Sequence, residues 1–200
     1  MDPERSFPPI IDVTVARGWL DAVEVRQGAL ALGRPAAAPL PRGPELAGLA
    51  GVAAKFLAVG TPRTMGLIGL RDLAPAVVAT QRAYSVPREL RVFDGDPVAA
   101  ARIAEAVGGR VASLTEACAC DVVVARGPVA IEREWIRGGT LVTALDRGVK
   151  LAPALVAAAV IYTAGEVPDL TAHATLGAVA AGLVDGRTLD EITILVIGPA

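Results

Sequence analysis

The stretch MGLIGLRDLAPA, residues 65–76, indicates a buried strand that runs into a tight turn and then a helix. A dinucleotide-binding turn at such a junction has the pattern G-x-G-x-x-G/A, in which the first glycine makes the turn and the second admits a pyrophosphate. Gly69 can be the first member of this pattern and Ala74 the third, whereas the middle position is Arg71. The turn therefore predicts a dinucleotide site with one altered position.

Arg71 has two interpretations, which the sequence leaves open. Its side chain can block the approach of the phosphates, so that nucleotide binding is weak or lost, or it can fold outward and pair with a phosphate. An acidic residue follows the next strand at Asp94, 25 residues beyond Gly69, where a ribose hydroxyl would be held. If a cofactor binds, Asp94 favours NAD over NADP, because its charge repels a 2′-phosphate.

On both sides of this turn the chain alternates between apolar strands and helices. Runs such as Val122-Val123-Val124 are almost wholly apolar, as strands buried on both faces of a parallel sheet are. The predicted strands are 64–68, 90–93, 110–112, 122–125, 141–144, 160–163 and 192–197, and the predicted helices are 72–85, 97–107, 114–119, 152–159 and 172–182. This alternation predicts an α/β fold with a Rossmann-like, doubly wound parallel sheet.

The N-terminal residues show a different, alternating pattern. Ile10–Val15 (IIDVTV) and Leu20–Val25 (LDAVEV) alternate with period two, which predicts a small antiparallel β-hairpin turning at Arg17-Gly18, with a third strand from Gly28 to Leu32. The proline-rich segment 33–44 reads as a linker before a helix that starts at Pro44. We therefore expect residues 1–43 to form a reduced β segment that dimerises, and 44–200 to form the nucleotide-binding domain.

Composition excludes several classes of function. The net charge of −2, from 19 basic and 21 acidic residues, gives no basic surface for nucleic acid. The longest apolar stretch, Leu151–Ala164, is too short for a membrane-spanning helix and contains Pro153, and no signal peptide is visible. We expect a cytoplasmic protein, with Cys118 and Cys120 as buried structural thiols.

The order of these segments resembles the ornithine cyclodeaminase/mu-crystallin family, which includes alanine dehydrogenases and imine reductases. The resemblance is carried by GLIGLRDLAPAVVATQRAYSVPRELRVFDGDPVAAARIAE, VASLTEACACDVVVARGP, EWIRGGTLVTALD and, most specifically, AHATLGAVAAGLVDGRTLDEITILVIG, and it spans residues 46–198. It implies a Rossmann domain that binds NAD(H) or NADP(H), beside a substrate domain that also forms a dimer. The chemistry it implies is hydride exchange at the α-carbon of an amino acid through an imine.

The resemblance also implies roles for individual residues. In the cyclodeaminases an aspartate after a G-x-x-x-N-A strand assists catalysis, and Asp146 in GGTLVTALD falls at that place; its alternative role is to cap a turn or pair with Arg147. Arg126 replaces part of the family's T-A-T loop and is a candidate for binding the cofactor. A substrate carboxylate requires Arg or Lys, and the candidates at the carboxyl ends of the strands are Arg71, Arg126 and Arg147.

The departures from the family set the balance between two hypotheses. The middle glycine is Arg71, the family's carboxylate-binding arginine at the start of the helix is replaced by Glu45-Leu46-Ala47, and 200 residues leave little room for a substrate domain. We therefore place first a shortened, divergent member that is a non-catalytic or weakly binding dimer. The alternative is an NAD(P)-dependent oxidoreductase or cyclodeaminase acting on an amino acid or cyclic imine.

No metal site is expected. His173 is the single histidine of the chain, and the interpretation favoured for it is a surface or interface position. Cys118-Ala119-Cys120 lacks the ligand spacing of a zinc site or of a C-x-x-C redox pair. The expected partners are a dinucleotide, a small amino-acid-like ligand and a second copy of the chain.

Overall fold

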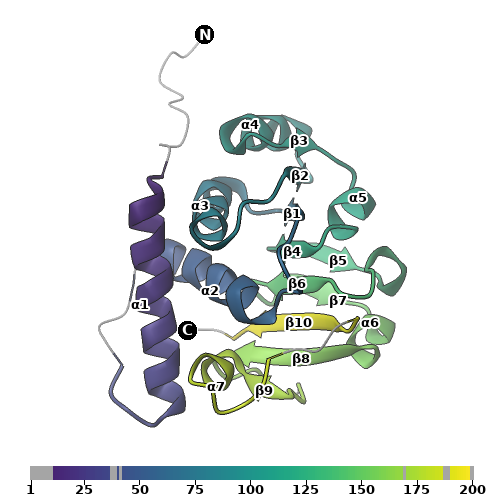
Figure 1. Ribbon diagram of the computed structural model, residues 1–200. Helices are drawn as coiled ribbons and strands as arrows, with labels where there is room; N and C mark the ends of the chain where they lie inside the picture. The colour runs from purple at the N-terminus through teal and green to yellow at the C-terminus, as the bar shows by residue number, and fades with distance from the viewer. Residues whose placement is uncertain (1–10, 37–39, 41, 169, 187–189, 199–200) are drawn as a thin grey trace.

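The computed structural model describes residues 11–36, 40, 42–168, 170–186 and 190–198, and its centre is a parallel β-sheet (Figure 1). Every strand pair in this eight-stranded sheet of the described residues is parallel. Across the sheet lie β3 (Arg110–Val111), β2 (Glu89–Phe93), β1 (Thr64–Ile68), β4 (Val122–Ala125), β6 (Leu141–Ala144), β10 (Ile192–Ile197), β8 (Ala159–Ala164) and β9 (Ala174–Thr175).

Helices cover both faces of the sheet, as Figure 1 shows. One face carries α2 (Arg42–Leu57), α3 (Ala74–Tyr84), α4 (Pro97–Val107) and α7 (Leu176–Ala180). The other carries α5 (Leu114–Cys118), α6 (Pro153–Ala157) and a two-stranded sheet of β5 (Val129–Ile131) and β7 (Val149–Leu151). The long helix α1 (Val13–Ala31) forms an outer layer against α2, α3 and α7.

The doubly wound α/β fold predicted from the sequence is confirmed. The chain order reverses between the neighbouring strands β1 and β4, which is the switch point at which ligands bind in such sheets. All four residues of β4 and all four of β6 are buried, which is why β4 is a continuous apolar run and β6 is apolar except for Thr143. The core on both faces is built from aliphatic side chains, with Tyr162 as its largest fully buried member.

The predicted N-terminal hairpin is wrong: the described part of that segment is the single helix α1. Ala16, Leu20 and Val23 are buried at helical spacing, and the carboxylate of Asp12 caps the helix by accepting a hydrogen bond from the Thr14 amide at 2.6 Å. The alternating pattern misled because apolar residues on two sides of a helix also alternate locally. Ile10 of the first predicted strand lies outside the described residues.

Tertiary packing explains why this segment forms a helix and not the predicted hairpin. Gly48 of α2 lies directly under Val23 and the Trp19 carbonyl of α1, where an added Cβ would come within 2.5 Å of the Val23 side chain. Gly177 of α7 likewise faces the Gln27 carbonyl of α1. A helix can approach these small residues closely and bury its apolar side chains there. The division of the chain into one unit of residues 1–43 and another of residues 44–200 stays a prediction.

Three smaller features complete the fold. The short strands β5, β7 and β9 were not predicted, because two or three residues carry no periodic pattern. The predicted helix 172–182 starts only at Leu176, where the Thr175 hydroxyl accepts a hydrogen bond from the Ala178 amide, so His173 lies ahead of it and is exposed. Among the described residues, no helix has both the length and the apolar character required to span a membrane.

Candidate functional site

The glycine turn after β1 is held between the ends of the two neighbouring strands. The Gly69 amide donates to the Phe93 carbonyl at 2.9 Å, and the Arg126 amide donates to the Ile68 carbonyl at 2.9 Å. Gly69 has φ +64°, and a Cβ at this position would collide with the Arg126 carbonyl oxygen. The turn therefore requires glycine at 69, as the motif predicted.

Arg71 adopts the backbone conformation that a glycine would have at the second position of the motif. Its φ is +49°, in the left-handed region, and it begins a short 3-10 turn, Arg71–Leu73, that leads directly into α3. Ala74, at the third position of the motif, is fully buried against the sheet. The Arg71 side chain is 70% exposed, so it projects outward and does not fill the turn.

Asp94 follows β2 and lies next to the turn. Its side chain is only 3% exposed, and its Oδ1 accepts a hydrogen bond from the Asp96 amide at 2.9 Å. The Oδ2 atom is buried without a hydrogen-bond partner, and it lies 3.8 Å from Nε of Arg71. Three of the residues predicted to bind the cofactor, Gly69, Arg71 and Asp94, are thus brought together at the tips of β1 and β2.

Asp146 lies in the loop after β6 and joins that loop to the one after β4. Its Oδ1 accepts hydrogen bonds from the amides of Gly127 at 3.0 Å and Gly148 at 2.9 Å, and its Oδ2 lies 3.5 Å from Nε of Arg126. The carboxylate therefore caps a turn, as the alternative interpretation proposed, but pairs with Arg126 rather than Arg147. About 40% of its side chain stays exposed, so it remains accessible to a ligand.

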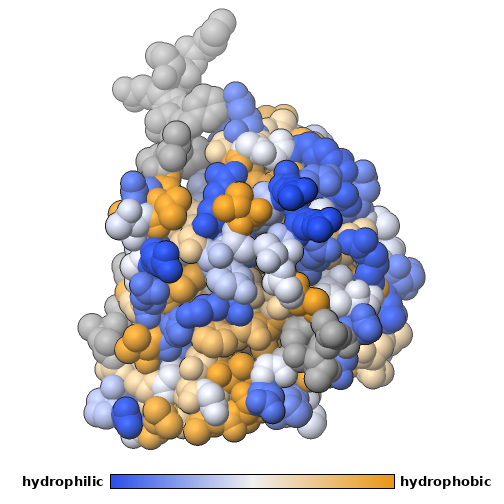
Figure 2. Space-filling model, viewed as in Figure 1, coloured by the Kyte–Doolittle hydropathy of each residue, from blue (hydrophilic) through white to orange (hydrophobic). Residues whose placement is uncertain are grey.

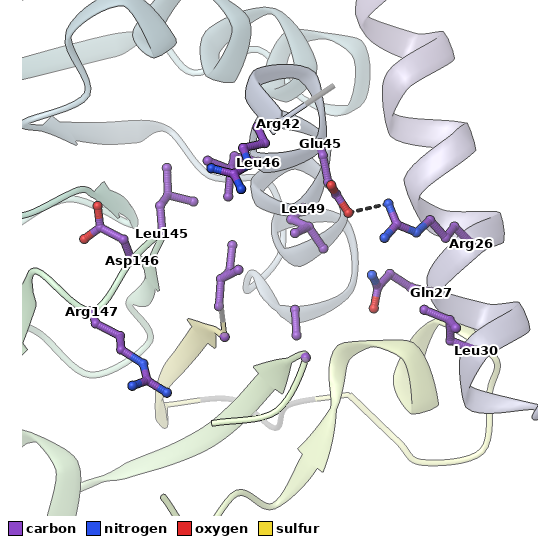
Figure 3. A pocket seen from close by; sticks show the side chains of 14 residues that line it. Arg26, Gln27, Leu30, Arg42, Glu45, Leu46, Leu49, Leu145, Asp146 and Arg147 are labelled. Atoms are coloured by element: carbon purple, nitrogen blue, oxygen red, sulfur yellow. Dashed lines mark hydrogen bonds and ion pairs between the residues drawn. The ribbon is translucent and has the colours of Figure 1, made fainter. Parts of the chain in front are cut away.

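A cavity of about 440 Å³ opens next to Asp146, at the carboxyl ends of β6, β8 and β10. Helices α1 and α2 form its other wall, and Figure 3 shows side chains from both helices and from the loop after β6 around it. Figure 2 shows apolar surface gathered on the lower half of the same view, over α7 and β10. The lining residues are Arg26, Gln27, Leu30, Arg42, Glu45, Leu46, Leu49, Leu145, Asp146, Arg147, Ala164, Gly165, Ile197 and Gly198.

Two guanidinium groups of this cavity are free to receive an anion. Arg26 is paired with Glu45, as the dashed line in Figure 3 indicates. Arg42 and Arg147, by contrast, form no ion pair within the described parts of the chain, and both side chains are exposed. They extend from opposite walls, one from the first residue of α2 and the other from the loop after β6. Such groups are suited to bind carboxylates.

Only part of this site was predictable from the sequence. Of the three arginines proposed for a carboxylate, Arg147 lines the cavity, Arg126 lies beside Asp146, and Arg71 lies with Asp94 instead. The sequence predicts no arginine at the start of the helix before the core, where Glu45-Leu46-Ala47 stands, whereas α2 starts at Arg42 and places the Arg42 side chain in the cavity. Arg42 was missed because the helix was predicted to start at Pro44, two residues after the start of α2 in the structure.

The three remaining candidate residues, two cysteines and a histidine, are described by their packing and burial. Burial raises the pKa of the Cys118 thiol to about 12 and that of Cys120 to about 11, so both are protonated thiols at neutral pH. His173 packs edge-on against Tyr162, with ring centroids 5.6 Å apart. Among the residues that the structure describes, no group of three or more His, Cys, Asp or Glu side chains could hold a metal ion.

A glycine turn at the switch point, an acidic residue after β2 and a cavity at the strand ends are together typical of dinucleotide-binding α/β domains. No protein-family model matches the chain, and no curated protein sequence shows significant similarity to it. Solved structures do match. An archaeal alanine dehydrogenase dimer with bound NAD aligns over 94% of this chain and 87% of its own, with a TM-score of 0.78 and 22% identity.

Two further structures agree with this match. The Δ1-pyrroline-2-carboxylate reductase of Thermococcus litoralis, in complex with NADH and L-proline, aligns over 78% of this chain and 59% of its own, with a TM-score of 0.69 and 20% identity. The iminosuccinate reductase of Paracoccus denitrificans, in complex with NAD+, aligns over 78% and 58%, with a TM-score of 0.66 and 24% identity. These likenesses show that the chain shares the fold of these three proteins.

Proposed function

We propose that this protein is a nicotinamide-dinucleotide-dependent oxidoreductase acting on a small amino acid or its imine. The observation that carries the proposal is the cavity at the carboxyl ends of β6, β8 and β10, where Arg42 and Arg147 flank the accessible carboxylate of Asp146. The same carboxylate is linked through Arg126 to the Gly69 turn, since the Arg126 amide and carbonyl both contact that turn. A cofactor site and a substrate site are thereby adjacent.

The residues at the turn fit a dinucleotide. The absence of a side chain at Gly69 leaves the turn close to the β4 loop, and the buried Oδ2 of Asp94 lacks a hydrogen-bond partner. Gly69 and Ala74 would let the diphosphate approach the start of α3, and the Arg71–Asp94 pair would meet the adenosine ribose. When bound, the nicotinamide ring supplies a hydride or accepts one.

The residues of the cavity divide the remaining work. Arg42 and Arg147 bind the substrate carboxylate and thereby orient its α-carbon. Asp146 exchanges a proton with the substrate nitrogen, because its Oδ2 is not held by a backbone amide. The apolar side chains of Leu46, Leu49 and the neighbouring walls exclude water from the reacting carbon.

The second candidate is a protein that keeps the fold but does not catalyse a reaction. It is favoured by Arg71, which stands where the motif has a glycine. Titration with NADH and NADPH, followed by nucleotide fluorescence or calorimetry, separates the two. We expect the wild type to bind the cofactor and to reduce NAD(P) with a small amino acid such as alanine or proline. We expect Arg42→Ala to weaken this activity about tenfold or more. Absence of binding at millimolar cofactor would leave the non-catalytic candidate in place.

We further propose a homodimer built on the N-terminal segment, now in the form of helix α1. Its outer face carries an apolar stripe with the alternating three- and four-residue spacing of a coiled-coil seam, and Val25 in it is 69% exposed. The stripe consists of Val15, Gly18, Ala22, Val25, Ala29 and Leu32. Because the inner face of α1 already packs on α2, this stripe suits the identical stripe of a second copy.

Val25→Glu is expected to convert the dimer to a monomer, because it places a charge at the most exposed large apolar position of the stripe. The measurement is light scattering coupled to size-exclusion chromatography. Arg17→Glu, on the same helix, exposed and outside the stripe, is the control and should leave the dimer intact. A wild-type chain that elutes as a monomer at all concentrations would contradict the proposal.

A further inference from the structure

The ion pair between Arg71 and Asp94 is unequal in its exposure. The Arg71 side chain is 70% exposed, whereas that of Asp94 is 3% exposed and its Oδ2 is shielded from solvent. The guanidinium therefore lies on the outside of the pair and the carboxylate beneath it. A ligand that approaches the end of β2 meets the positive charge of Arg71 before it meets Asp94.

This arrangement alters what the adenosine end of the site can recognise. In the usual arrangement an acidic residue after the second strand accepts a hydrogen bond from the ribose 2′-hydroxyl. Here Oδ1 of Asp94 is already engaged by the Asp96 amide, and Oδ2 is shielded from solvent 3.8 Å from Nε of Arg71, so a ribose hydroxyl directed at Oδ2 comes next to the guanidinium. Discrimination against a 2′-phosphate by Asp94 is correspondingly weakened, because the nearby guanidinium offsets its charge.

Arg71 also has donors to spare. A guanidinium carries five N–H donors, and within the described residues the Arg71 side chain forms no hydrogen bond. The neighbouring Asp96 carboxylate is occupied as the cap of α4, accepting from the Val98 amide at 2.9 Å. The planar donor edge of Arg71 is thus free for an anion, and bidentate binding of phosphate is what guanidinium geometry favours.

We infer that Arg71 binds the 2′-phosphate of an adenine dinucleotide and that the site prefers NADP(H) to NAD(H). The inference rests on the proposed cofactor function and reverses the preference that Asp94 alone suggested. The position of Arg71 in the turn makes this a specificity device that a single substitution can undo. Because φ at residue 71 is +49°, glycine fits the same backbone, so Arg71→Gly removes the cation without disturbing the turn.

The test compares NADPH with NADH, and 2′,5′-ADP with 5′-AMP, by calorimetry on the wild type and on Arg71→Gly. We expect the wild type to bind each 2′-phosphorylated ligand about tenfold or more tightly than its partner, with a difference that shrinks at high salt. Arg71→Gly should lose this preference and bind NADH more tightly, because the Asp94 carboxylate is uncovered. Arg102→Ala, which removes an exposed arginine of α4 with no ion pair to Asp94, should leave the preference unchanged.

The possible failures are distinguishable. If the wild type binds NADH as tightly as NADPH, or if Arg71→Gly weakens both cofactors equally, the assignment of Arg71 is overturned while the dinucleotide site stands. If neither the wild type nor Arg71→Gly binds any of the four ligands, the proposed cofactor function fails and this inference fails with it. The assignment is supported only if Arg71→Gly shifts the cofactor specificity toward NADH relative to the wild type.

Discussion

Replacing Gly66 with alanine is expected to lower the free energy of unfolding by about 3 kcal/mol or more. Gly66 lies in the middle of β1, an interior strand between β2 and β4, and a Cβ there would collide with the backbone carbonyl of Ala117 in α5. Backbone cannot rotate away as a side chain can, so α5 would have to move off the sheet. Urea denaturation followed by circular dichroism measures the loss.

Gly28→Ala is the matched control, with an expected effect of opposite sign. Gly28 lies inside α1, and nothing approaches within 4 Å of the position where its Cβ would be built. Alanine is the better helix former, so this change should raise the stability by about 0.5–1 kcal/mol. Equal effects of the two substitutions would contradict the close packing of α5 on β1.

Asp146→Asn is expected to reduce kcat by about 10²- to 10⁴-fold, which is the usual contribution of a positioned acid or base. The asparagine carbonyl can still accept the hydrogen bonds from the amides of Gly127 and Gly148, so the two loops should keep their arrangement. Turnover is measured with the amino acid that gives the fastest NAD(P) reduction, and the melting temperature is measured in parallel.

Asp146→Ala separates the two roles of this residue. It removes the acceptor as well as the charge, and should therefore also cost about 1–3 kcal/mol of stability, because two amides lose their partner. An asparagine variant as active as the wild type would mean that Asp146 only joins the loops. Retained stability in the alanine variant would instead contradict the structural role.

Prediction from the sequence succeeded where burial is uniform. The strands 64–68, 122–125, 141–144 and 192–197 agree with the structure at both ends, because strands covered on both faces are mostly apolar along their whole length. Residues 11–32 were predicted incorrectly, since an apolar residue at every second position suits a half-buried strand and also a helix with two apolar sides. The neighbours Gly48 and Gly177, distant in the sequence, decide between them.

The candidate site divides in the same way. Gly69, Ala74 and Asp94 were predictable, because the turn and the residue after the next strand are close in the chain and follow one pattern. Arg26, Gln27 and Arg42 were not predicted, because they come from two helices that reach the carboxyl ends of β6, β8 and β10 only after the chain has folded.

By itself, the sequence determined the doubly wound sheet and the position of the glycine turn after β1, because both arise from local apolar runs and from glycine. Tertiary structure decided that α1 is a helix, that Arg42 enters the cavity, and that Arg71 lies over Asp94. These three features depend on contacts between segments far apart in the chain or on the direction of a side chain. The spacing of residue types along the chain encodes neither these contacts nor the direction of a side chain.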